Sequence, residues 1–177
     1  MRLPKVLLAL VFVLASCDSS GEADVLSGWI NAAFVGDVDA AAEFLADDVE
    51  WIGLGESPAV FAEGSRPFAS QIESVECNDS AAIPTCDVVW TDLWIDAIPD
   101  LGAGHLRATG EIRDGQIVAF RQWHFAPEIT QAFNAHIRWL GQTQPEESAH
   151  ACDDDPGAST CSTLLVNTVR AWIDANP

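Results

Sequence analysis

Hydrophobic residues at helical spacing dominate the first part of the chain. Between residues 25 and 34 they recur every three or four positions, which is typical of an amphipathic helix. Ser19 and Glu22 have the spacing of a capping box, and Gly36 follows the last hydrophobic position. We therefore expect a helix between these residues, followed by a second short helix capped by Asp37.

The middle of the chain changes from helical to extended patterning. The second helix is expected to end at residues 47–48, and Val49–Ile52 reads as a short strand. A further helix is predicted to begin near Arg66, with a proline in its first turn. The hydrophobic positions then alternate with a period of two, which predicts strands at Ser70–Cys77 and Thr85–Ile95.

A β-hairpin over Ala103–Phe125 is the clearest element in the sequence. The Asp-Gly pair at 114–115 is a strong signal for a two-residue turn between antiparallel strands. If this turn sets the register, Arg113 pairs with Gln116, and further along the strands His105 lies directly opposite His124.

The C-terminal part is predicted to be helical at both ends. Pro127 is expected to begin a helix whose hydrophobic stripe includes His136 and which ends at Gly141. The polar segment Gln142–Ser162 reads as a linker, and a last amphipathic helix follows over Leu165–Ile173.

The N-terminus has the organisation of an export signal. Arg2 and Lys5 precede an apolar run, Val6–Ala15, which is too short to span a membrane. The run ends in Leu-Ala-Ser-Cys at residues 14–17, which resembles the lipobox of bacterial lipoproteins. This resemblance implies cleavage before Cys17 and attachment of a diacylglycerol, with palmitate among the acyl groups, to its sulfur. The alternative is an ordinary secretory signal with an incidental cysteine.

The charge of the chain excludes several classes of partner. Its formal net charge of −19 leaves no clustered Lys and Arg with which to bind nucleic acid. Cleavage before Cys17 removes Arg2 and Lys5 and leaves a charge of −21. Because Lys5 is the only lysine, the mature chain cannot use a lysine Schiff base, a Ser-Lys dyad or a P-loop lysine.

Four further cysteines form two pairs of equal spacing, Cys77 with Cys86 and Cys152 with Cys161. In an exported protein, an even set of this kind favours disulfide bonds, and local pairing is the simplest of three connectivities. A zinc site is the competing interpretation, but the spacing of a zinc ligand set is missing. The acidic run at 153–155 lacks the glutamate of a calcium loop, so no metal is expected.

The order of motifs resembles the SnoaL-like branch of the nuclear-transport-factor-2-like superfamily over Val25 to His124. The residues that carry this resemblance are Trp29–Phe34, Gly36–Asp39, Phe44–Trp51 and Ile112–Ile117. It implies an α+β fold in which a curved, mostly antiparallel sheet forms a cone around the N-terminal helix and encloses a pocket. Exported family members with a cysteine pair on adjacent strands and a C-terminal helical extension are similar.

The residues available for catalysis in such a pocket are few. The chain has no tyrosine, and Gln122 on the last strand cannot act as the general base that cyclase-like members place there. The remaining candidates are His105, His124, Arg107, Glu111 and Asp92. A histidine pair that faces a pocket could exchange protons near neutral pH, because an unperturbed imidazole titrates at about pH 6.5. The alternative is that both histidines are partly exposed strand residues near the end of the sheet.

An unusual number of tryptophans favours binding of a flat apolar ligand. The sequence has 7 tryptophans, and Trp90 and Trp94 are expected to share one face of a strand with Asp92. Ordinary core packing is the alternative interpretation of these side chains. The predicted pocket consists of Trp29, Trp51, Trp90, Trp94, Arg107, Phe120 and His124.

These observations predict a signal peptide at residues 1–16, a tether at 17–22, a cone domain at 23–126 and a helical extension at 127–177. The leading hypothesis is a lipoprotein on the extracytoplasmic side of the cell membrane. It would be a non-enzymatic module that binds a small apolar ligand or a protein partner, and it would use no cofactor. The alternatives are a SnoaL-type lyase or isomerase that uses a pocket histidine, and a structural module that forms homodimers.

Overall fold

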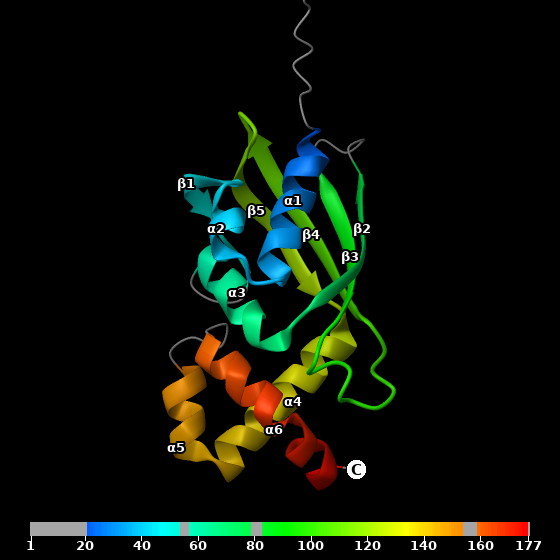
Figure 1. Cartoon of the computed structure of the whole chain (residues 1–177), viewed down its shortest axis with the longest axis vertical. Helices are drawn as coiled ribbons and strands as arrows, with labels where there is room; N and C mark the ends of the chain where they lie inside the picture. The colour runs from blue at the N-terminus through cyan, green and yellow to red at the C-terminus, as the bar shows by residue number, and fades with distance from the viewer. Residues whose placement is uncertain (1–20, 54–56, 79–82, 154–158, 177) are drawn as a thin grey trace, which may run out of the picture.

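A curved five-stranded sheet and two groups of helices make up the computed structural model (Figure 1), which describes residues 21–53, 57–78, 83–153 and 159–176. The strands lie in the order β1-β5-β4-β3-β2. The elements of the cone are α1 (Glu22–Phe34), α2 (Val38–Ala42), β1 (Leu45–Glu50), α3 (Pro58–Ser65), η1 (Arg66–Phe68), β2 (Gln71–Asn78), β3 (Thr85–Thr91), β4 (Gly104–Arg113) and β5 (Gln116–Phe125). The extension consists of α4 (Pro127–Thr143), α5 (Pro145–Ser148), η2 (Ala149–Asp153) and α6 (Ser159–Ala175).

The α+β fold expected from the sequence is confirmed. Only β1 and β5 run parallel, and the other neighbouring strands are antiparallel. Helix α1 lies along the sheet and contacts β2, β3, β4 and β5 (Figure 1). Its fully buried residues Leu26, Trp29, Ile30 and Ala33 form the centre of the core, as the helical spacing predicts.

The end of α1 and the start of α2 follow the predicted signals. Gly36 has a φ of +75°, which glycine adopts without the steric cost that a Cβ atom would bring. The side chain of Asp37 then accepts a hydrogen bond from the backbone N–H of Ala40, over 3.1 Å, and caps α2. Ser19 lies outside the described residues, and Gly21 occupies the N-cap position of α1.

The hairpin forms at the predicted turn, but its register changes along the strands. Arg113 pairs with Gln116, as expected. Two bulges then add Val118 and Arg121 to β5 without partners on β4. The prediction that His105 lies opposite His124 is therefore wrong, because the added residues bring His124 opposite Arg107.

Three predicted boundaries in the cone are also wrong. Strand β1 begins at Leu45 and includes residues 47–48, because pairing with β5 holds this segment extended. The helix expected from Arg66 is α3, which ends at Ser65 and is capped by Ser57, and only the 3₁₀ turn η1 follows it. Strand β3 ends at Thr91, so Asp92 and Trp94 belong to the turn after the strand.

The extension is more helical than its polar sequence suggests. Helix α4 continues past Gly141 to Thr143, and the expected linker contains α5, η2 and the beginning of α6. Figure 1 shows these helices at one end of the sheet, where α6 packs against α3, η1 and α4. No described helix is long and apolar enough to cross a membrane.

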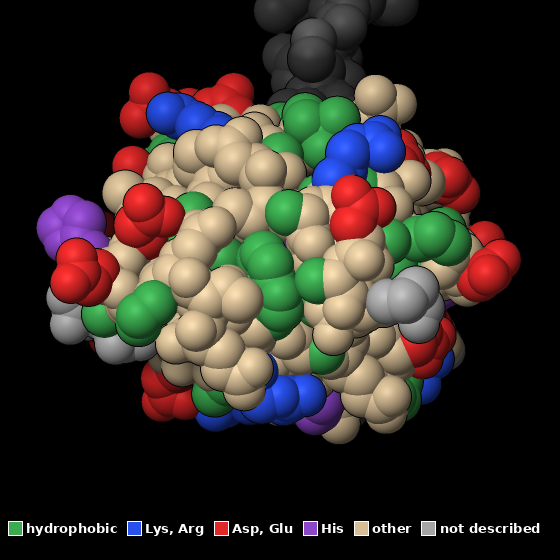
Figure 2. All heavy atoms as spheres, turned by 90° about the horizontal axis from the view of Figure 1, so that it is seen from below, with side chains coloured by type: hydrophobic (Ala, Val, Ile, Leu, Met, Phe, Trp, Pro, Cys, Tyr) green, Lys and Arg blue, Asp and Glu red, His purple; other side chains and the backbone are tan. Residues whose placement is uncertain are grey.

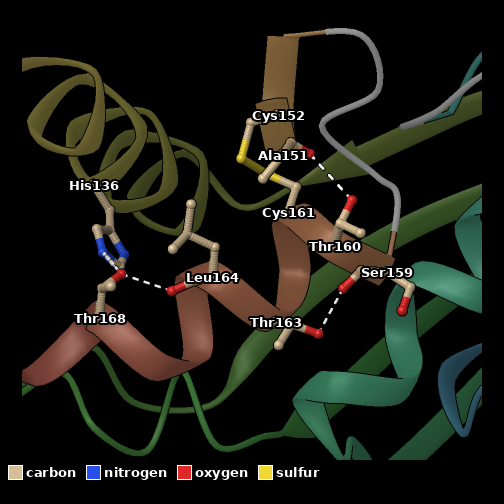
Figure 3. The surroundings of a disulfide bond; sticks show 9 residues. All are labelled: His136, Ala151, Cys152, Ser159, Thr160, Cys161, Thr163, Leu164 and Thr168. Atoms are coloured by element: carbon tan, nitrogen blue, oxygen red, sulfur yellow. Dashed lines mark hydrogen bonds between the residues drawn. A yellow bond between two sulfur atoms is a disulfide. The ribbon is translucent and has the colours of Figure 1, made fainter. Parts of the chain in front are cut away.

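Both cysteine pairs lie at disulfide-bonding distance in the predicted local connectivity. Cys77 and Cys86 are cross-strand neighbours on β2 and β3, with Cα atoms 4.0 Å apart. Cys152 and Cys161 join η2 to the first turn of α6, with Cα atoms 4.8 Å apart (Figure 3). The second bridge therefore links the two helical segments that flank residues 154–158.

Candidate functional site

The inside of the cone is filled by aromatic side chains. Trp29 of α1 is fully buried, and its ring centroid lies 4.6 Å from that of Phe120 and 5.8 Å from that of Trp51. Phe61 and Trp123 complete the cluster around the Trp29 ring. Three residues of the predicted pocket thus pack against one another: Trp29 and Phe120 in the core, and the partly buried Trp51 against them.

A cavity of about 570 Å³ lies where the cone meets the helical extension. The turn after β3, the end of β5, the η1 region and α4 all contribute to its walls. Its aromatic lining residues are Phe34, Phe61, Phe68, Trp90, Trp94, Phe125 and Phe133. Ile95, Ile129 and Ile137 add aliphatic surface, and Ser65, Ser70, Asp92, Thr130 and Asn134 supply the polar groups. Of the predicted pocket residues, Trp90 and Trp94 line this cavity.

Figure 2 shows the molecule from the end at which α4 to α6 lie. Hydrophobic side chains lie in the middle of this face, and both acidic and basic side chains lie around it. An apolar centre with a charged surround is a common arrangement at ligand-binding surfaces.

Asp92 is the only ionisable side chain among the described residues that line the cavity. It is 7% exposed. Its Oδ1 accepts hydrogen bonds from the backbone N–H groups of Trp94 and Ile95, over 2.9 and 2.7 Å. Its Oδ2 accepts one from the indole Nε1 of Trp90, over 3.0 Å. Aspartate favours such sites because its short side chain reaches the N–H groups of the following turn.

Burial and hydrogen bonding shift the pKa of the Asp92 carboxyl group in opposite directions. Burial raises the pKa of Asp92 above its ordinary value, because the charged form loses its water. The three hydrogen bonds to the carboxylate lower the pKa and offset part of this effect. The group is thus a buried acid whose negative form is held by two N–H groups of the following turn and by the indole of Trp90 on β3.

His136 of α4 lies behind the cavity wall and is fully buried. Its Nδ1 accepts a hydrogen bond from the indole Nε1 of Trp94, over 3.0 Å. Since an indole can only donate, the neutral ring carries its hydrogen on Nε2. Nε2 lies 3.0 Å from Oγ1 of Thr168, which itself donates to the carbonyl of Leu164 over 2.7 Å (Figure 3).

This chain of hydrogen bonds suits a neutral imidazole. Burial lowers the pKa of His136 to about 4, so the ring is uncharged at pH 7. The Trp172 ring stacks on it, with centroids 4.7 Å apart and planes 7° from parallel. The hydrophobic stripe of α4 placed His136 on the inner face, but nothing in the sequence indicated its partners on the β3 turn and α6.

Arg107 and His124 line a different and smaller depression, of about 250 Å³, together with His105 and Asp87. The guanidinium of Arg107 donates two hydrogen bonds to the carboxylate of Asp87, over 2.7 and 2.9 Å. These bonds lower the pKa of Asp87. Both histidines are exposed, so the pair predicted as catalytic candidates lies on the surface.

The structure therefore separates the residues proposed for acid–base catalysis. Asp92 lines the large cavity, and His124 and Arg107 line the small depression. Among residues 21–53, 57–78, 83–153 and 159–176, no group of three or more His, Cys, Asp or Glu side chains is placed to hold a metal ion. The arrangement in the large cavity provides an apolar volume with one acidic group, which is suited to binding.

Several cavity residues were not predicted, notably Phe68, Phe125, Ile129 and Phe133. They come from η1, β5 and α4, which are far apart in the sequence and meet only through packing. Ile129 and Phe133 belong to the hydrophobic stripe of α4. The spacing of this stripe predicts that both residues are buried, but it does not predict a cavity beside the helix.

No protein-family model matches the sequence, and no curated protein sequence is significantly similar to it. Among solved structures, the chain is similar to an NTF2-like protein of unknown function from Cytophaga hutchinsonii ATCC 33406. The two share 11% identity and superpose with a TM-score of 0.45, over 62% of this chain and 94% of the other.

Proposed function

We propose that the protein is a lipid-anchored binding module on the extracytoplasmic side of the membrane, and that its large cavity holds a small apolar or amphipathic molecule. The observation that carries this proposal is the cavity of about 570 Å³ lined by seven aromatic side chains. This volume lies within the range of about 300–1,000 Å³ common for small-molecule sites.

The chemistry of the lining supports binding of an apolar body. Two of the polar side chains that line the cavity already donate hydrogen bonds to backbone carbonyl groups. The hydroxyl of Ser65 donates to the carbonyl of Phe61, and that of Thr130 donates to the carbonyl of Ala126. The free surface offered to a ligand is therefore mainly aromatic and aliphatic, and its burial is the expected driving force.

The place of the cavity in the fold suits attachment at the N-terminus. Helix α1 begins at the end of the molecule opposite the helices α4 to α6 (Figure 1). A lipid on Cys17 would be five residues from Glu22, the first residue of α1. Anchoring at that end would place the helices α4 to α6, and with them the cavity that α4 helps to line, at the end of the molecule away from the bilayer. The disulfide pairing is consistent with an oxidising compartment.

Binding is tested with the mature chain, residues 17–177, carrying Cys17→Ser so that it is not acylated. Native mass spectrometry of the purified protein reports any retained small molecule and also any dimer. Titration with the uncharged fluorescent probe N-phenyl-1-naphthylamine then measures binding to an apolar site.

A pair of variants localises the binding to the cavity. Thr130 lies on the exposed side of α4 and lines the cavity, so Thr130→Trp should fill it and weaken probe binding at least tenfold. Gln131 is its exposed neighbour and does not line the cavity, so Gln131→Trp should bind the probe like the parent protein. Absence of probe binding in the parent, or an equal effect of both variants, would contradict the proposal.

A further inference from the structure

We infer that the ligand of the large cavity is an amphipathic cation, with a protonated amine next to the carboxylate of Asp92 and an apolar body against the aromatic walls. This inference rests on the proposed function and adds the chemical class of the ligand. It follows from the hydrogen-bonding capacity of Asp92, from the absence of a cationic partner for it, and from the side chains around it.

Asp92 retains acceptor capacity on the oxygen that has fewer partners. Oδ1 accepts two backbone hydrogen bonds, and Oδ2 accepts one, from the Trp90 indole. Each carboxylate oxygen has two lone pairs, so Oδ2 can accept a further hydrogen bond. Because Asp92 lines the cavity, a ligand bound there is the natural donor.

The negative charge of Asp92 has no counter-ion within the described part of the chain. The ion pairs there join Arg107 to Asp87, Arg113 to Glu111, and Arg121 to Glu50 and Glu111. The carboxylate of Asp92 is instead held by neutral N–H donors. A buried charge without an opposite charge is costly, and a cationic ligand would supply the missing partner.

The walls next to Asp92 are also suited to a cation. Trp90 and Trp94 lie two positions before and after Asp92 in the sequence, and both line the cavity. Phe68, Phe125 and Phe133 line the same cavity. Aromatic faces attract ammonium groups, most strongly where water is excluded. No Lys or Arg side chain lines the cavity among the described residues, so a cation would meet no repulsion there. The net negative charge of the chain, −19, favours its approach.

The inference is tested with three probes that share one apolar body and differ in charge. They are 1-naphthylmethylamine, which is cationic at pH 7, 1-naphthalenemethanol, which is neutral, and 1-naphthoic acid, which is anionic. Calorimetric titration of the mature Cys17→Ser chain measures their dissociation constants at one fixed ionic strength. The amine is expected to bind at least about tenfold more tightly than the alcohol, and the acid more weakly than the alcohol.

Two variants with the same change in net charge separate Asp92 from the general acidity of the chain. Asp92→Asn should bring the dissociation constants of the amine and the alcohol close together, because it removes the negative charge; the ratio of the two constants is the measured quantity, since the substitution also changes a residue of the cavity wall. Asp96 is exposed and follows in the same turn, its backbone N–H donating to the carbonyl of Asp92, but it does not line the cavity. Asp96→Asn should keep the preference, and the unfolding temperature of each variant shows whether it is folded.

The outcomes distinguish this inference from the proposal on which it rests. Equal binding of the amine and the alcohol, or tighter binding of the acid, would overturn the inference and leave a cavity for apolar ligands. An amine preference that survives in Asp92→Asn, or that is lost equally in Asp96→Asn, would overturn it as well. Failure of all three probes, together with the fluorescent probe, would overturn both.

Discussion

The indole Nε1 of Trp94 donates a hydrogen bond to Nδ1 of His136 over 3.0 Å, and this bond joins the turn after β3 to helix α4. Trp94 lines the cavity with its ring, and His136 connects it onward to Thr168 of α6. The wall of the cavity is thus fixed to the helical extension by buried polar contacts. Because such contacts have directional geometry, they specify how the extension docks on the cone.

The buried imidazole makes the stability of the protein depend on pH. The pKa of His136 is about 4 in the folded chain and about 6.5 when the chain is unfolded. Between these values the unfolded chain binds more protons, so the free energy of unfolding falls as the pH drops from 6.5 to 4. The expected loss from this residue is about 3 kcal/mol.

The measurement is the free energy of unfolding by urea at pH 7, 5.5 and 4, compared with His136→Asn, whose amide does not titrate. Asp92 acts in the opposite direction, because its raised pKa makes the folded chain bind protons more readily. Since both proteins contain Asp92, its contribution cancels in the difference between them. An identical pH dependence in the two proteins would show that His136 is not held neutral.

The hydroxyl of Thr168 is expected to matter for stability because it lies in the buried chain of hydrogen bonds. Thr168→Val leaves Nε2 of His136 without its acceptor, and the expected cost is about 1–3 kcal/mol in the free energy of unfolding. Thr168→Ser keeps the hydroxyl and should recover much of this loss.

Thr163 provides a matched control on the same helix. It is exposed, and its hydroxyl donates to the carbonyl of Ser159 over 2.7 Å, as that of Thr168 does to Leu164 (Figure 3). Thr163→Val should change the free energy of unfolding by less than about 0.5 kcal/mol. Equal effects at the two positions would mean that the bond to His136 contributes nothing.

The turn of the β4–β5 hairpin is expected to require glycine at position 115. Gly115 has a φ of +79°, in the left-handed region that residues with a Cβ atom adopt at a cost. Gly115→Ala should therefore lower the free energy of unfolding by about 1 kcal/mol, although a Cβ atom there would contact nothing.

Gly141 in helix α4 serves as the contrasting position. A Cβ atom there also meets nothing within 4 Å, and the residue is exposed within the helix. Gly141→Ala should stabilise the protein by up to about 1 kcal/mol, because alanine has the higher helix propensity. Chemical denaturation of both variants gives the comparison, and destabilisation at both sites would refute the backbone argument.

Acylation of Cys17 predicts that cells expressing the full chain incorporate labelled palmitate into it. Cys17→Ala should abolish the label and release the protein from the membrane fraction. The four other cysteines remain as an internal control, since their pairing as disulfides leaves no thiol for acylation. Label that persists in Cys17→Ala would exclude the lipobox interpretation.

The sequence by itself determined the features that depend on neighbouring residues. The helical period of α1, the cap at Asp37 and the turn at 114–115 follow from local sterics and hydrogen bonding. The pairing of Cys77 with Cys86 was favoured for a similar reason, since a short loop separates the two residues. The α+β architecture was predicted from the resemblance to a known superfamily, which the order of the motifs along the chain carries.

Only the tertiary structure decided which side chains meet across the molecule. The two bulges in β5 moved His124 opposite Arg107, and alternation along the strand does not reveal where an extra residue is accommodated. Trp29 and Trp94 are the same residue type, yet Trp29 fills the core and Trp94 lines the cavity. The cavity exists because α4 and α6 dock against the end of the sheet, and docking depends on contacts between residues distant in sequence.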